Sequence, residues 1–112
     1  MIKIRFHEYK GGDVSLKVTG HSGSAEKGED LICAAASMLV YTLAQLVKNG
    51  KEGGAFDGKP TLSLKPGDAC IRCRPKDADT YAEVARWFLH TQTGLLLLEH
   101  NAQGYVKVFE TI

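Results

Sequence analysis

The chain has 112 residues, the usual length of one domain, and 44% of them are hydrophobic, enough for a core without disulfides or metal. A formal net charge of +1 excludes the broad positive field typical of proteins that bind nucleic acid or membranes through bulk attraction. Three cysteines, an odd number, and the lack of an N-terminal signal segment favour a cytoplasmic protein with reduced thiols. We therefore expect a single cytoplasmic domain over residues 1–112, with no direct nucleic-acid contact.

Membrane association is also not expected. The longest fully apolar stretches, such as residues 95–98, are far shorter than the roughly 18 residues that a membrane-spanning helix needs.

The N-terminal part predicts a β-hairpin over residues 1–9 and 14–19. Apolar residues alternate with polar ones on both sides of Gly11 and Gly12, which is typical of strands with one buried face. The apolar positions are Ile2, Ile4, Phe6, Val14, Leu16 and Val18. The second strand ends near Gly20, so His21 lies at its tip.

A glycine-containing loop then leads into a helix expected over residues 31–47. We expect Asp30 to be the N-cap, which places Cys33 in the first helical turn. Unpaired amides and the positive end of the helix dipole stabilise an anion there, so a Cys33 thiolate is expected. Apolar residues surround much of this helix, which predicts packing on more than one side, and residues 48–50 are expected to close it.

Residues 60–65 and 69–74 predict a second hairpin around a turn at Pro66 and Gly67. This hairpin contains Cys70 and Cys73, whose spacing resembles that of redox and zinc sites. Residues three apart on a strand point to opposite faces, however, so we expect neither a disulfide nor a metal site.

Asp77 or Asp79 is expected to cap a second long helix, and residues 105–112 predict a last strand. Gly94 within that helix predicts a close approach of another element or a slight bend. Trp87 lies off the apolar line, which is compatible with a dimer contact, although ordinary partial burial is the favoured interpretation. The predicted buried line consists of Tyr81, Val84, Ala85, Phe88, Leu89, Leu95 and Leu96. The order β-β-α-β-β-α-β predicts an α+β fold, with a sheet of hairpin-linked strands covered by two helices.

Functionally, the residue pair of interest is Cys33 and His21, interpreted as a nucleophile and its base. Two glycines in the intervening loop allow the imidazole to approach the sulfur. The alternative is that Cys33 is a small buried hydrophobic residue and His21 a polar residue at a strand end. Ser37 lies one turn beyond Cys33, where its hydroxyl either reaches the site or bonds back to the helix.

Three short motifs carry a family resemblance. They are Gly20-His21-x-Gly23, Glu26-x-Gly28-x-Asp30 and Ile32-Cys33-Ala34-x-Ala36-Ser37. Together they resemble the signature of Prp, the bacterial ribosomal-processing cysteine protease family, and the likeness covers nearly the whole chain. Lys27, where an aromatic residue is common in the family, and the variable Ser24 are departures that bear on substrate preference.

The resemblance implies a cytoplasmic protease, without cofactor, that removes an N-terminal extension from a large-subunit ribosomal protein, and it implies a homodimer. His21 and Cys33 correspond to the catalytic pair, with Asp30 and Ser37 supporting. Gly20, Gly23, Glu26 and Gly28 form the expected substrate loop, which we expect to close over a bound peptide. The competing interpretation is a ribosome-associated peptide-binding or assembly module in which Cys33 is structural.

Overall fold

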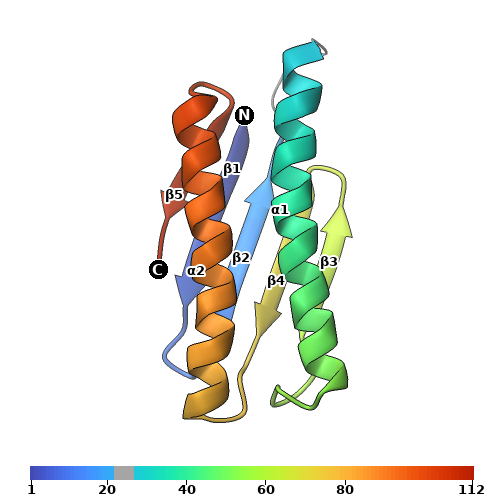
Figure 1. Cartoon of the computed structure of the whole chain (residues 1–112), viewed down its shortest axis with the longest axis vertical. Coiled ribbons are helices and arrows are strands. Elements are labelled where there is room, and N and C mark those ends of the chain that lie inside the picture. The colour runs from blue at the N-terminus through green and yellow to red at the C-terminus, as the bar shows by residue number, and fades with distance from the viewer. Residues whose placement is uncertain (22–26) are drawn as a thin grey trace.

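A computed structural model describes residues 1–21 and 27–112 of the chain, and for residues 27–30 it describes the backbone alone. The elements follow the predicted order β-β-α-β-β-α-β (Figure 1). They are β1 (Ile2–Glu8), β2 (Val14–Thr19), α1 (Lys27–Glu52), β3 (Thr61–Lys65), β4 (Asp68–Cys73), α2 (Ala78–Asn101) and β5 (Val106–Glu110). The predicted α+β class is confirmed.

The five strands form one mixed sheet in the order β3-β4-β2-β1-β5. Neighbouring strands are antiparallel except β1 and β5, which are parallel. Both helices lie on the same face of the sheet (Figure 1). Side chains of β1 therefore alternate between buried and exposed along Ile2–Phe6, as the sequence pattern predicts.

The hydrophobic core lies between the sheet and the two helices. Burying each large apolar side chain stabilises the fold by about 1.5–3 kcal/mol. The largest side chains with almost no exposed surface are Ile4, Phe6 and Leu16 from the first hairpin, Ile71 from β4, Leu43 from α1, and Phe88 and Leu95 from α2.

Helix α1 is longer than predicted at both ends. It begins at Lys27 rather than after Asp30, so the helix includes Gly28 and Asp30, and Cys33 lies in its second turn. It continues through Gly50, where closure was expected, to Glu52. Gly50 lies against the rings of Phe56 and Trp87, which a Cβ at this position would approach to 3.0–3.2 Å, so glycine leaves room for both rings.

Helix α1 packs on more than one side, as predicted, because it contacts both the sheet and α2, but its outer face is apolar and exposed. Leu31 is 71% and Met38 65% exposed, whereas Val40 and Leu43 are buried against the sheet. The segment Leu31–Glu52, with a mean hydropathy of 1.6, is long and apolar enough to cross a membrane by length and composition. Counting only consecutive apolar residues missed it. Core helices of soluble proteins pass the same test, and the inner face of this one is part of the core.

Helix α2 has the predicted cap. The Asp77 carboxylate accepts a hydrogen bond from the Thr80 backbone N–H at 2.8 Å, and this bond lowers the pKa of Asp77. The predicted close approach at Gly94 is also confirmed, since a Cβ there would lie 2.8 Å from Leu39 Cδ2 of α1.

The predicted buried line of α2 is wrong at two positions, because Leu89 is 41% and Leu96 37% exposed. Thr91 and Gln92 are buried instead. The buried Gln92 side chain forms two hydrogen bonds with the backbone of Ile112. Its amide oxygen accepts one from the Ile112 N–H at 2.7 Å, and its amide nitrogen donates the other to the Ile112 carbonyl oxygen at 3.2 Å. Trp87 is not a spare surface residue either, because it packs against the core beside Gly50.

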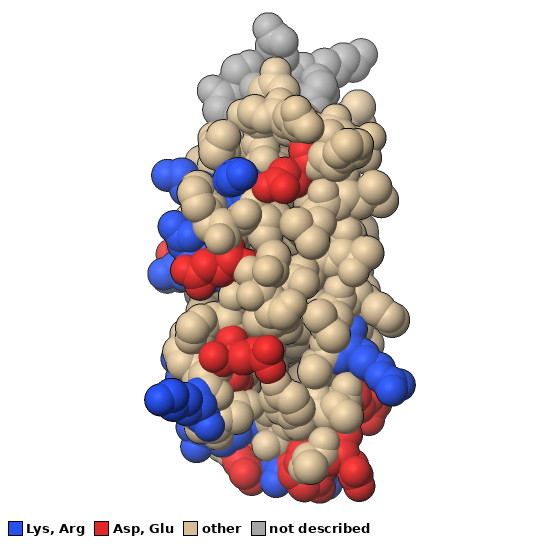
Figure 2. All heavy atoms as spheres, turned by 90° about the vertical axis from the view of Figure 1, so that its left-hand side faces the viewer, with Lys and Arg blue, Asp and Glu red and all other residues tan. Residues whose placement is uncertain are grey.

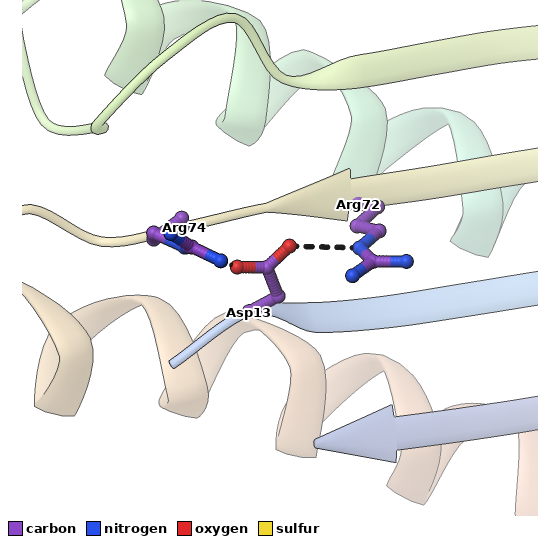
Figure 3. Close-up of polar contacts among 3 residues, drawn as sticks. All are labelled: Asp13, Arg72 and Arg74. Atoms are coloured by element: carbon purple, nitrogen blue, oxygen red, sulfur yellow. Dashed lines mark hydrogen bonds and ion pairs between the residues drawn. The ribbon is translucent and has the colours of Figure 1, made fainter. Parts of the chain in front are cut away.

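A polar cluster of three residues lies at the β1–β2 turn. Arg72 of β4 and Arg74 just after it donate to the two carboxylate oxygens of Asp13 (Figure 3). Two opposite charges close to the carboxylate favour its ionised form. The cluster therefore holds the β1–β2 turn against β4, away from the candidate site.

Candidate active site

A cavity of about 290 Å³ lies where the end of β2, one face of α1 and the β3–β4 turn meet. His21 and Cys33 both line it, so the fold brings the predicted base and nucleophile to one cavity. The cavity is also lined by Gly20, Ser37, Tyr41, Leu64, Lys65, Pro66, Gly67 and Asp68.

His21 follows directly after a glycine that the local backbone requires. Gly20 has a φ of +88°, and a Cβ there would collide with the carbonyl oxygen of Met1. Only glycine adopts this conformation without cost while letting another backbone approach so closely. The sharp turn at Gly20 places the exposed His21 side chain at the cavity rather than along the direction of β2.

Three polar side chains of α1 face the cavity at intervals of four residues: Cys33, Ser37 and Tyr41. Residues four apart lie on the same side of a helix, so they form one stripe. Cys33 and Ser37 are half-buried, and Tyr41 is 53% exposed. The predicted position of Ser37 beside Cys33 is confirmed, whereas sequence reasoning missed Tyr41, although the same spacing would have found it.

The β3–β4 hairpin supplies the opposite wall, which sequence reasoning also missed. Leu64, 41% exposed, lines the cavity beside Lys65, Pro66, Gly67 and Asp68. This turn reaches the site because Thr19, at the end of β2, pairs with Asp68. No local sequence signal shows such a pairing, since the two residues lie far apart in the chain.

The rest of the predicted site is only partly visible. Gly23 and Glu26 lie outside the described residues, as does most of the expected closing loop. Gly28 and Asp30 belong to α1, and the side chain of Asp30 is not described. The role of Asp30 as N-cap was wrong, because the helix begins three residues earlier.

The same helix start changes the expected stabilisation of charge. Only the first four N–H groups of a helix lack a partner within it, and Cys33 follows a complete turn. Unpaired amides at Cys33 are therefore not a source of anion stabilisation, contrary to the prediction. Ser37, whose hydroxyl can donate a hydrogen bond, lines the same cavity one helical turn after Cys33.

The two remaining cysteines do not take part in the site. Cys73 is buried and Cys70 half-buried on the other face of β4, so the predicted opposite orientation is confirmed. Burial, reinforced by Asp13, raises the pKa of Cys73 to about 12. All three cysteines lie in the described part of the chain, and none is in a disulfide.

These features define a small α+β domain with a cysteine and a histidine at one surface cavity. The family model described as Cysteine protease Prp matches residues 1–107, and the chain belongs to this cysteine protease family. No curated protein sequence matches the chain.

Solved structures share the fold. The ribosomal processing protease Prp from S. aureus, with a covalently linked product peptide, has a TM-score of 0.72 at 20% identity, covering 99% of this chain and 100% of that one. The same protease with a substrate peptide has a TM-score of 0.67 at 18% identity, with the same coverage. SMU.848 from Streptococcus mutans has a TM-score of 0.67 at 26% identity, covering 99% of this chain and 94% of that one.

Proposed function

We propose that this protein is a cytoplasmic cysteine endopeptidase that removes the N-terminal extension of a bacterial large-subunit ribosomal protein during ribosome maturation. The observation that carries the proposal is the placement of His21 and Cys33 on one cavity in a chain of the Prp family. The S. aureus relative was crystallised with substrate and product peptides, which agrees with a peptide as the ligand.

In the proposed reaction, His21 accepts the proton of the Cys33 thiol, and the sulfur attacks the scissile carbonyl carbon. The C–N bond breaks as His21 gives that proton to the leaving amine, and a thioester remains on Cys33. Water then attacks the thioester with His21 as base, which releases the new carboxylate and restores the thiol. Ser37 donates a hydrogen bond toward the carbonyl oxygen as negative charge develops.

The sheet edge beside the cavity suits an extended peptide. Strand β3 pairs with β4 on one side and has no strand on the other among the described residues. Leu64 of β3 lines the cavity, so a peptide added along this edge would pass His21 and Cys33. Backbone hydrogen bonds to a sheet edge give affinity, and pockets for side chains give specificity.

The proposed enzyme is a homodimer, with the outer face of the two helices as its interface. Figure 2 shows a broad area without charged side chains on the α2 side of the molecule. Exposed apolar residues of the two helices outside the cavity include Leu31 and Met38 of α1 and Leu89, Leu96 and Leu97 of α2. Exposed apolar patches of this kind are typical of interfaces between subunits. Trp87 is not among them.

The deciding experiment uses the ribosomal protein encoded in the same genome, with its N-terminal extension. Wild-type protein should remove the extension, and Cys33→Ala should lower turnover by at least about 10³-fold, since the nucleophile is lost. Cys70→Ala, which removes a half-buried thiol from the opposite face of the sheet, should retain activity. Binding of the extension without cleavage by wild-type protein would instead favour the peptide-binding module.

A further inference from the structure

We infer that Gly67, in the β3–β4 turn, is a positioning residue that holds the imidazole of His21 in the cavity. The inference rests on the proposed function, in which His21 is the catalytic base, and it says which residue orients that base. Gly67 itself touches no reacting atom.

The ring of His21 lies directly on the backbone of Gly67. A Cβ added at Gly67 would lie 2.5 Å from His21 Nε2, 2.8 Å from Cε1 and 3.3 Å from Cδ2. Real side chains do not approach so closely, so the ring occupies the space that any other residue at this position would fill. The imidazole therefore packs in the space that is left open because Gly67 has no side chain.

The backbones of the two segments are also tied together. Gly20, the residue before His21, donates its N–H to the Gly67 carbonyl oxygen at 2.9 Å. The neighbouring pair Thr19 and Asp68 continues the antiparallel ladder of β2 and β4. The β3–β4 turn thus contacts His21 in two ways. It hydrogen-bonds the backbone just before His21, and it packs against the Nε2 side of the imidazole ring.

Substitution at Gly67 should move the ring without unfolding the protein. The imidazole is the end of an exposed side chain, so it swings away from a new Cβ more easily than packed backbone would. Gly67 also has a φ of +72°, and alanine there adds backbone strain of about 1–2 kcal/mol. The effect of the strain must be separated from the effect on His21.

Gly58 is the matched control. It has the same φ of +72°, but a Cβ there would have no atom of the other described residues within 4 Å, apart from its two chain neighbours. Gly58→Ala therefore carries the backbone strain without the ring contact. Gly67→Asn is a second variant, because asparagine tolerates the left-handed conformation while still placing a Cβ against His21.

The experiment compares kcat and KM for cleavage of the extended ribosomal protein, together with the imidazole C–H resonances of His21 by NMR. Gly67→Ala and Gly67→Asn should lower kcat by about 10²-fold with little change in KM, and should shift the His21 resonances. Gly58→Ala should change neither. Both readouts are made on variants that circular dichroism shows to be folded.

Wild-type kcat in the folded Gly67 variants, or equal loss in Gly58→Ala, would overturn the inference. Failure of the proposed function is recognised separately. If wild-type protein cleaves nothing, the resonances still decide whether Gly67 positions His21: a shift in both Gly67 variants and not in Gly58→Ala supports it, and unchanged resonances overturn it.

Discussion

Arg72 donates a hydrogen bond from its Nε to Asp13 Oδ2 over 2.8 Å, which joins β4 to the turn before β2. Arg74 donates to the other carboxylate oxygen (Figure 3). The carboxylate is mostly buried, with 13% of the side chain exposed. Hydrogen bonds from Arg74 and then Arg72 lower the pKa of Asp13.

This cluster predicts an acid-sensitive contribution to stability. The pKa of Asp13 is lower in the folded chain than in the unfolded chain, where it is about 3.9. The ionised Asp13 carboxylate therefore stabilises the fold fully when the pH is above its pKa in the unfolded chain. This contribution is lost as the pH falls through its lower pKa in the folded chain. Asp13→Asn should lower the free energy of unfolding at pH 7 and pH 5, with a smaller difference at pH 3.

Urea unfolding at the three pH values measures this effect. Asp57→Asn is the control, because Asp57 lines one surface hollow together with Asp13, Arg72 and Arg74 but forms no ion pair with the described residues. A difference between wild type and Asp13→Asn that stays the same from pH 7 to pH 3 would contradict the assignment.

The three cysteines should differ in reactivity. In the proposed function His21 accepts the proton of the Cys33 thiol at the same cavity, so iodoacetamide at pH 6 should modify Cys33 first. Cys73 should react last, since it is 2% exposed and its pKa is raised to about 12. Mass spectrometry of the modified peptides over time gives the three rates. His21→Ala should slow Cys33 alone, and faster modification of Cys70 than of Cys33 would count against a catalytic thiol.

The strands were predictable because each has one face in the core. Alternation at Ile2, Ile4 and Phe6 depends only on the strand period of two residues, and the buried positions agree. The strand order was not predictable, because β5 reaches β1 by a parallel pairing between distant segments. Hydrophobic alternation shows that a strand has a buried face but not which strand lies beside it.

The two central residues of the candidate site were predictable, but the residues around them were not. Cys33 and His21 were found from their residue types and motifs, and the cavity brings them together. The helix start was wrong because Asp30 is a strong capping residue, whereas the helix continues back through Gly28 despite a cost of about 1 kcal/mol for a helical glycine. Gly67 looked like an ordinary turn residue, since its contact with His21 exists only after folding.

The outer helix face predicts the oligomeric state. Leu97 of α2 is 63% exposed, and a second copy covering the outer helix face would remove it from water. Leu97→Glu would then bury a charge without a partner, which should weaken dimerisation by about 2 kcal/mol or more. Sedimentation velocity at micromolar concentration should show a dimer for wild type and a monomer for Leu97→Glu.

Phe109→Glu provides the matched control for this prediction. Phe109 is 47% exposed, and it lies on β5 beneath the Arg5 guanidinium, on the face of the sheet that the helices do not cover. Replacing it adds the same charge at a similarly exposed apolar position, so this variant should remain a dimer. A monomeric wild type would exclude the homodimer. Equal dissociation of both variants would contradict an interface across Leu97. A general effect of added charge would weaken dimerisation in both variants, whereas an interface on the helix face predicts weaker dimerisation in Leu97→Glu alone.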